Sequence, residues 1–328
     1  MLIQIGMLVF AIILAVYSAK YLVAGAISIA RQFNIPQFII GAFIIGFGTS
    51  LPEFSVNLGA ALQGNTDLAL ANILGSNLFN TCVVLGLIGL SGTLVINSDV
   101  RVKDTPYHMI AALMIAVCGN QLYLDHINYH QLMLSHGIIL LSFFSIYVYY
   151  TLLEVKQGAS HKKPLHAHHH VASTEEVLPS TLSSFIKVAL GLSGLVVGGE
   201  LIVSSAEEIA SLFGLSNRLI GLLIVGPGTS MPELIASIIA LKQRNTALVL
   251  GNVMGSNLFN VFFTLGITAT ITPIPFDFSL NQAVLLNFVS AVFLAVTFAF
   301  INREKMSKLT AFLLLLIYGV YIFLAIIN

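Results

Sequence analysis

Uninterrupted apolar runs of membrane-spanning length recur along the whole chain and constrain its fold more than any other feature. A helix needs about 20 apolar residues to cross the hydrocarbon core of a bilayer. Hydrophobic residues occupy 57% of the 328 positions and charged residues 9%, with a mean hydropathy of +0.94, whereas about a quarter of the residues in a soluble domain are charged. A β-barrel would show short alternating segments in place of continuous runs. The sequence therefore predicts an all-α polytopic membrane protein.

The apolar runs divide into ten predicted helices around one polar segment. The first run lacks the basic start of a signal peptide, so we read it as a retained helix. The polar segment, residues 154–180, contains HKKPLHAHHH (His161–His170) and is predicted to be a histidine-rich cytoplasmic linker. It separates a five-helix unit at 1–153 from a second five-helix unit at 181–328. The predicted transmembrane helices cover 2–30, 36–62, 67–91, 106–123, 131–153, 181–212, 217–242, 246–271, 281–301 and 308–327.

The distribution of Lys and Arg predicts the orientation in the cell (inner) membrane, because cytoplasmic loops carry an excess of these residues. The loops after even-numbered helices hold only Arg218. The loops after odd-numbered helices hold many more: Arg31, Arg101, Lys103, Lys156, Lys162, Lys163, Lys242, Arg244, Arg303, Lys305 and Lys308. Both termini are therefore expected on the non-cytoplasmic side. Since each unit has an odd number of helices, the second unit would enter the membrane from the opposite side.

The two units share a gapless internal repeat at a constant offset of 180 residues. Gly46–Asn80 reads GFGTSLPEFSVNLGAALQGNTDLALANILGSNLFN, and Gly226–Asn260 reads GPGTSMPELIASIIALKQRNTALVLGNVMGSNLFN. By direct comparison 19 of these 35 positions are identical. The repeats extend over about 41–91 and 221–271. Homologous units of opposite orientation form inverted repeats, a transporter architecture with its binding site near the midplane.

The GTSxPE frame places a carboxylate inside each repeated helix, where a charge is costly and functional by default. These carboxylates belong to Glu53 and Glu233. The preceding prolines loosen the helix and release backbone carbonyl oxygens, and the frame glycines permit non-helical backbone. Carboxylate, hydroxyl and carbonyl oxygens together suit hard cations such as Ca²⁺ and Na⁺. The candidate ligands of this frame are Gly46, Thr49, Ser50, Glu53, Gly226, Thr229, Ser230 and Glu233.

The GSNLFN frame supplies a second set of oxygen donors on the next helix of each unit. Serine and asparagine lie four residues apart there and so share one helix face. Ser76, Asn80, Ser256 and Asn260 are predicted to face the ions. Asparagine also serves interhelical hydrogen bonding, and this structural role is the one expected for Asn72, Asn77, Asn252 and Asn257.

With GTSxPE followed by GSNxxN in both units, the sequence resembles the cation/calcium exchanger superfamily, specifically its prokaryotic sodium/calcium exchanger-like members. The resemblance covers the whole chain and implies a Na⁺/Ca²⁺ antiporter that works by alternating access, with three Na⁺ exchanged for one Ca²⁺. It also implies that helices 2–30 and 181–212 slide as a gate. The implied calcium ligands are Thr49, Glu53, Thr229 and Glu233. The implied sodium ligands are Ser50, Ser76, Ser230, Ser256 and the carbonyls near Gly46 and Gly226.

Two departures from the family pattern stand out. Some members carry aspartate where Asn80 and Asn260 stand here, so this chain has two central carboxylates and a weaker case for potassium coupling. Pro227 stands in a position where small or aliphatic residues are commoner, and it would kink only one repeat.

Three alternatives remain open at this point. A proton/calcium exchanger of the same fold is the runner-up, because two glutamates could carry protons. A zinc carrier is suggested by the histidine-rich linker, yet the repeated helices contain no histidine. An intramembrane enzyme lacks support from HExxH or Gly-x-Ser-x-Gly motifs. We expect Ca²⁺, Na⁺ and the lipid bilayer as partners, and neither a cofactor nor a nucleic acid.

Overall fold

The computed structural model describes residues 2–64, 66, 69–98, 100–120, 131–160, 180–213, 226–276, 280–301 and 303–327. These residues are mostly helical, and several helices contain π-helical turns, designated η. The elements of the first unit are α1 (Leu2–Gln32), α2 (Gln37–Ile40), η1 (Gly41–Gly46), α3 (Phe47–Thr49), α4 (Leu51–Leu62), α5 (Ala69–Leu78), η2 (Phe79–Val84), α6 (Leu85–Ser91), η3 (Val100–Asp104), α7 (Thr105–Gly119), β1 (Gln131–Leu132) and α9 (Leu134–Ser160).

The elements of the second unit follow the same general order. They are α10 (Thr181–Leu212), α12 (Gly226–Gly228), α13 (Met231–Lys242), α14 (Thr246–Leu258), η5 (Phe259–Leu265), α15 (Gly266–Ile271), β2 (Ile274–Pro275), α16 (Asn281–Val296), η7 (Thr297–Ile301) and α17 (Lys308–Ile327). Strands β1 and β2 join the two units as an antiparallel pair, with Gln131 opposite Pro275 and Leu132 opposite Ile274. Residues 161–179, most of the predicted linker, and residues 214–225, where the seventh predicted helix begins, lie outside the described residues.

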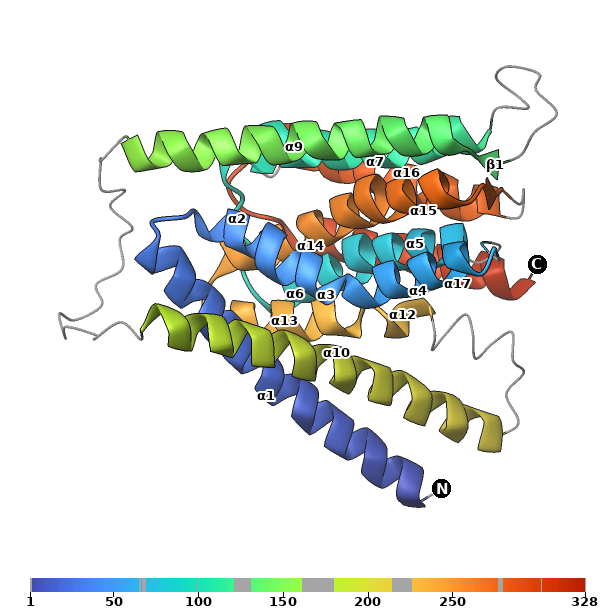
Figure 1. Ribbon diagram of the computed structural model, residues 1–328, viewed down its shortest axis with the longest axis horizontal. Helices are drawn as coiled ribbons and strands as arrows, with labels where there is room; N and C mark the ends of the chain where they lie inside the picture. The colour runs from blue at the N-terminus through green and yellow to red at the C-terminus, as the bar shows by residue number, and fades with distance from the viewer. Residues whose placement is uncertain are drawn as a thin grey trace.

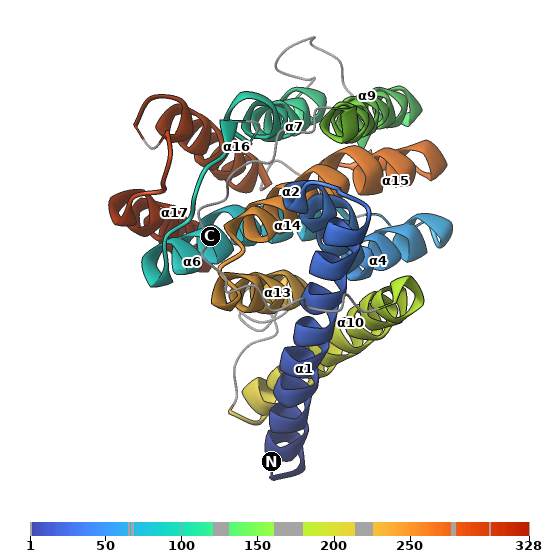
Figure 2. The ribbon, with the colours of Figure 1, turned by 90° about the vertical axis from the view of Figure 1, so that its left-hand side faces the viewer.

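The helices form layers around a buried centre (Figures 1 and 2). Helices α1 and α10 pack along each other on one side, whereas α7, α9 and α16 lie on the opposite side. The segments that carry the repeated motifs lie between them, with α14 packed against α2, η1 and α13. In the most apolar 18-residue window of Thr246–Ile271, 94% of the residues are buried, against 17% for Lys308–Ile327. The helix that carries the GSNLFN motif of the second unit therefore lies at the centre of the molecule, and α17 lies at its periphery.

Seven helices among the described residues are long and apolar enough to cross a membrane, and the bent pair Gln37–Thr49 and Leu51–Leu62 would make an eighth. This establishes a membrane-type helical protein. Of the other predicted helices, the fourth does not meet this criterion, and the seventh is described only from Gly226 onward. Helix α7 ends at Gly119, four residues before the predicted end, and the described part of the seventh, α12 and α13, begins at Gly226.

Each repeated helix is broken just before its glutamate. Segments Gln37–Thr49 and Leu51–Leu62 meet at an angle of 47°. Ser50 at the break has φ −87° and ψ 9°, and Ser230 in the second unit has φ −92° and ψ 9°. Pro52 and Pro232 occupy the first turn of the following helix, where a missing N–H costs nothing. The prolines therefore restart α4 and α13 and place Glu53 and Glu233 in their first turns.

Close backbone packing explains the glycine of the GSN motif in the second unit, Gly255, whereas its counterpart Gly75 has no atom within 4 Å of an added Cβ among the described residues. A Cβ atom added at Gly255 would lie 2.5 Å from the Ala42 Cα atom, and one added at Gly46 would lie 2.8 Å from the Asn252 carbonyl oxygen. Only glycine allows α14 to approach η1 this closely. This approach brings the GSN motif of the second unit against the GTS motif of the first.

Candidate cation site

Both repeated glutamates lie in the buried centre of the molecule. Glu53 and Glu233 are each 0% exposed, although a carboxylate placed in an apolar interior needs compensation. Three of the four hydroxyl-bearing residues of the two breaks, Thr49, Ser50 and Ser230, are also 0% exposed, whereas the fourth, Thr229, is partly exposed. The structure therefore brings the predicted GTSxPE residues together in a buried centre formed by both units.

Hydrogen bonds across the centre pair each glutamate with the opposite unit. The Ser50 hydroxyl donates to Oε1 of Glu233 at 2.9 Å, and the Ser230 hydroxyl is 3.4 Å from Oε1 of Glu53. The two contacts are equivalent under the 180-residue offset. Each carboxylate is consequently held by the helix break of the other unit.

The GSNLFN residues complete this arrangement from the neighbouring helices. The Ser256 hydroxyl lies 3.4 Å from Oε1 of Glu233 and donates to the Gly46 carbonyl at 3.0 Å. In the other half, the hydroxyls of Ser76 and Thr229 lie 3.2 Å apart. The contacts thus bring together the predicted ligand residues Gly46, Thr49, Ser50, Glu53, Ser76, Thr229, Ser230, Glu233 and Ser256. Asn80 and Asn260 lie four residues beyond the two serines, on the π-helical turns η2 and η5. For Gly226 the structure establishes only that it begins α12.

The backbone carbonyl oxygen that precedes the first break accepts several hydrogen bonds, whereas the sequence predicts that the prolines release carbonyl oxygens in this region. The Gly46 carbonyl accepts from the Ser50 amide at 3.1 Å, from the Thr49 hydroxyl at 3.2 Å and from Ser256. In the second unit the Ser230 amide instead bonds three residues back, to the Pro227 carbonyl at 3.2 Å. The backbone hydrogen bonds at the two breaks therefore differ, although the two sequences align without a gap.

Several buried polar side-chain atoms of the candidate ligands have no hydrogen-bond partner among the described residues. Four are oxygens: Oε2 of Glu53, Oε2 of Glu233, Oδ1 of Asn260 and Oδ1 of Asn80. The fifth is the amide nitrogen Nδ2 of Asn80. Unpaired buried polar atoms are costly and therefore rare in folded proteins. Unpaired carboxylate and amide oxygens, with hydroxyl oxygens beside them, are ligands that Ca²⁺ and Na⁺ prefer. In the part of the chain that the structure describes, no group of three or more His, Cys, Asp or Glu side chains could hold a metal.

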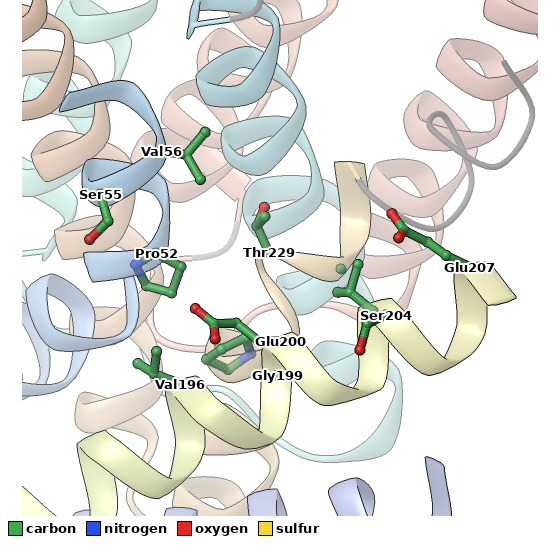
Figure 3. A pocket seen from close by; sticks show the side chains of 12 residues that line it. Pro52, Ser55, Val56, Val196, Gly199, Glu200, Ser204, Glu207 and Thr229 are labelled. Atoms are coloured by element: carbon green, nitrogen blue, oxygen red, sulfur yellow. The ribbon is translucent and has the colours of Figure 1, made fainter. Parts of the chain in front are cut away.

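A cavity of about 220 Å³ lies beside this centre, between α10 and the two helix breaks. Pro52, Pro232 and Thr229 line it from the breaks, and Glu200, Ser204 and Glu207 line it from α10. Figure 3 shows the Glu200 carboxylate extending from α10 towards Pro52. The sequence pattern did not single out Glu207 as part of any site, because it lies outside the repeated block.

A second buried polar network lies next to the candidate ligands. Asn260 donates to Oδ1 of Asn77 at 3.1 Å, and Asn77 donates to the Asn257 carbonyl at 3.2 Å. Asn257 donates to the Thr81 hydroxyl at 2.8 Å, which lies 3.2 Å from Nε2 of His108. These helix-to-helix bonds agree with the structural role predicted for Asn77 and Asn257. Thr81 and His108 were missed because neither belongs to a repeated motif.

Asn252 and Asn72 differ, although the repeat aligns them. Asn252 donates to the Glu233 carbonyl at 3.0 Å and to Ser237 at 2.9 Å, and its Oδ1 lies 3.3 Å from the Thr49 hydroxyl. The Nδ2 atom of Asn72 has no such partner among the described residues. Asn252 therefore ties the second glutamate's helix to the first break.

Apolar helices of membrane length that enclose a buried, oxygen-lined centre are typical of secondary cation transporters. Comparison with known proteins specifies the family. The profile of the sodium/calcium exchanger protein family matches residues 3–153 and 183–327, so the chain belongs to this family. It is accordingly a cation/calcium exchange antiporter of the cation/calcium exchanger superfamily.

Individual relatives cover most of the chain. The putative antiporter CaxA of Alkalimonas amylolytica is 35% identical over 267 residues, 80% of this chain and 79% of its own length. The inner membrane protein YrbG of Escherichia coli is 32% identical over 298 residues, 89% of this chain and 88% of its own. A structure of the sodium-calcium exchanger NCX_Mj, soaked with 10 mM Na⁺ and 10 mM Sr²⁺, superposes with a TM-score of 0.79 at 29% identity and covers 98% of both chains. The fold is thus that of NCX_Mj, in a multi-pass membrane protein.

Proposed function

We propose that the protein exchanges Na⁺ for Ca²⁺ across the inner membrane, and that one central site shared by both units binds the ions. The observation that carries this proposal is the reciprocal bonding of Ser50 to Glu233 and of Ser230 to Glu53. Two buried carboxylates, each hydrogen-bonded to a serine of the opposite unit, form a single centre. Two negative charges in that centre balance one Ca²⁺.

Within this centre we assign calcium to Thr49, Glu53, Thr229 and Glu233. Sodium would bind through the hydroxyls of the flanking serines and through backbone and amide oxygens: Ser50, Ser76, Ser230, Ser256, Gly46, Gly226, Asn80 and Asn260. The buried oxygens without protein partners support this assignment. With Asn80 and Asn260 neutral, a third Na⁺ would rest on dipoles alone, which makes the exchange electrogenic.

We further propose ten transmembrane helices in two inverted five-helix units, with both termini on the non-cytoplasmic side. The matching helix breaks and the reciprocal bonds support the inverted repeat. The clustering of basic loops at one end supports the orientation: Arg101 donates to the Arg303 carbonyl at 3.0 Å, and Val95 pairs with Lys305. At the other end Gln4 donates to Glu208 at 2.9 Å, beside the N-terminus.

Alternating access would arise from motion of α1 and α10 against the remaining helices. These two helices pack mainly on each other, and small residues line their contact: a Cβ atom added at Gly191 would lie 2.5 Å from the Leu22 amide nitrogen. Such close backbone contact would keep α1 and α10 together, so that they move as one unit. The cavity beside Thr229 would serve as an approach from the non-cytoplasmic side.

The coupling ion can be identified by testing which ion gradient drives ⁴⁵Ca²⁺ uptake into proteoliposomes. An outward Na⁺ gradient should drive uptake, and an outward proton gradient of equal size, without Na⁺, should not. Uptake driven by protons alone would assign the chain to proton/calcium exchange. Uptake of ⁶⁵Zn²⁺ in preference to ⁴⁵Ca²⁺ would instead support the zinc alternative.

A further inference from the structure

The cavity between α10 and the two helix breaks carries charge of one sign. Among the described residues that line it, the charged side chains are Glu200 and Glu207, with no lysine, arginine or histidine. Apart from the hydroxyls of Ser55, Ser204 and Thr229, the other lining residues are glycine, proline and valine. Neither carboxylate forms an ion pair with another residue that the structure describes. The cavity is therefore a negatively charged space within a mostly apolar wall.

This cavity reaches the candidate calcium ligands. Thr229, which is one of them, lines the cavity and is partly exposed, unlike its fully buried counterpart Thr49. Pro52 and Pro232 also line the cavity, and each directly precedes a central glutamate. Figure 3 shows the Glu200 side chain extending from α10 towards Pro52. The cavity thus connects the Glu200 carboxylate with the ligand Thr229.

The first unit does not repeat this acidic lining. The offset of 180 residues places Lys20 of α1 opposite Glu200 of α10, and Ile27 opposite Glu207. The Nζ atom of Lys20 lies 4.8 Å from the centre of the Tyr17 ring. The position that carries a negative charge on α10 therefore carries a positive charge on α1, and the two helices of the proposed gate differ in the sign of that charge.

Charge of one sign in a cavity with low-dielectric walls raises the local concentration of counter-ions and their rate of association. Because Coulomb energy is proportional to ionic charge, a field that enriches Na⁺ about threefold enriches Ca²⁺ about tenfold. We propose that Glu200 is a capture residue for Ca²⁺: its charge, supported by that of Glu207, draws Ca²⁺ into the cavity from the non-cytoplasmic side and sets the rate at which the ion reaches Thr229. This inference rests on the proposed function and orientation. It confines the effect of Glu200 to one side of the membrane.

Initial ⁴⁵Ca²⁺ uptake into Na⁺-loaded membrane vesicles of known sidedness tests this role. Right-side-out vesicles present the non-cytoplasmic face to the medium, everted vesicles present the cytoplasmic face, and membranes without the protein serve as the blank. External N-methylglucamine chloride would set the ionic strength to about 0.01 M or about 0.15 M, where the Debye length is about 30 Å or about 8 Å. The matched control is Glu208→Gln, which removes the same charge from the same helix. Glu208 is not among the residues that line the cavity and accepts a hydrogen bond from Gln4.

In right-side-out vesicles at the lower ionic strength, Glu200→Gln should lower kcat/KM for Ca²⁺ about tenfold and leave the maximal rate within about twofold of wild type. Glu200→Lys, which copies the charge of Lys20, should lower kcat/KM on the order of a hundredfold. Glu200→Asp and Glu208→Gln should both stay within about twofold. At about 0.15 M the loss in Glu200→Gln should shrink to about threefold. In everted vesicles all four variants should match wild type within about twofold.

Equal kcat/KM values for wild type and Glu200→Gln in right-side-out vesicles at low ionic strength would overturn the proposal. A loss of the same size in everted vesicles, or one that does not depend on ionic strength, would also overturn it, because either would indicate a structural role of Glu200 in α10. An equal loss in Glu208→Gln would show that the cavity has no special part in capture. Failure of the wild-type protein to couple ⁴⁵Ca²⁺ uptake to Na⁺ would instead refute the proposed function, so the two failures are distinguishable.

Discussion

A membrane potential should drive calcium uptake, because the centre has too few carboxylates to neutralise three sodium ions. Glu53 and Glu233 are the two acidic members of the candidate ligand set, and both are fully buried, whereas Asn80 and Asn260 are neutral. Two carboxylates balance one Ca²⁺ and leave a three-Na⁺ load about one charge more positive. Each cycle would therefore move one net charge.

The size of the effect follows from that charge. One elementary charge across 100 mV is worth about 2.3 kcal/mol, roughly a 50-fold change in the calcium gradient at equilibrium. In Na⁺-loaded vesicles an inside-positive potential should speed ⁴⁵Ca²⁺ uptake, because three Na⁺ leave for each Ca²⁺ that enters. An inside-negative potential should slow it.

The assay is initial ⁴⁵Ca²⁺ uptake under potassium–valinomycin clamps of either sign, with vesicles free of Na⁺ as the blank. Uptake that depends on Na⁺ but is equal at both potentials would indicate electroneutral two-for-one exchange. The reasoning about a third Na⁺ on dipoles would then be wrong.

Three further predictions concern the carboxylates and the linker. Glu53→Gln or Glu233→Gln should each nearly abolish ⁴⁵Ca²⁺ exchange while the protein still inserts into the membrane. The reason is the lost attraction between one unit charge and a divalent cation, about 8 kcal/mol at 4 Å and an effective dielectric constant near 20. The matched control is Glu154→Gln, which changes the partner of Lys103 at 2.6 Å and should transport normally. Replacement of His161–His170 by ten Gly and Ser residues should leave exchange within about twofold, since the segment is remote in sequence from every repeated residue; loss as complete as in the glutamate variants would contradict the linker interpretation. Lowering the pH should inhibit exchange, because protons neutralise the same two carboxylates that bind Ca²⁺. Excess Ca²⁺ should relieve this inhibition. An exchange rate unchanged by acid would refute the competition between protons and Ca²⁺.

The local chemistry of the site could be read from the sequence, whereas its tertiary pairing could not. The GTSxPE frame predicted a loosened helix with a carboxylate just beyond the proline, and the 47° break before α4 confirms the loosening. The crossed contacts from Ser50 to Glu233 and from Ser230 to Glu53 depend on how the units pack, and periodicity within one helix carries no such information. The same holds for Asn252, whose alignment with Asn72 predicts equivalence, although among the described contacts Asn252 alone of the two reaches the opposite break.

Features outside the repeat were harder still to predict. A lone buried histidine such as His108 has no pattern around it, and its partner Thr81 reads as an ordinary residue of an apolar helix. The π-helical turns η2 and η5 begin inside the LFN triplets, where hydrophobic spacing alone does not separate an α-helix from a π-helix. Such turns are frequent at functional sites, and here they contain Asn80 and Asn260.

The stoichiometry of calcium binding tests the shared centre most directly. Purified protein in detergent without Na⁺ would be titrated with Ca²⁺ by calorimetry, with wild type, Glu53→Gln and Glu233→Gln compared at the same concentration. We expect one Ca²⁺ per wild-type chain and no measurable binding in either variant, since each carboxylate completes the same site. Two Ca²⁺ per wild-type chain, with one retained in each variant, would show two independent sites and contradict a single centre formed by both units.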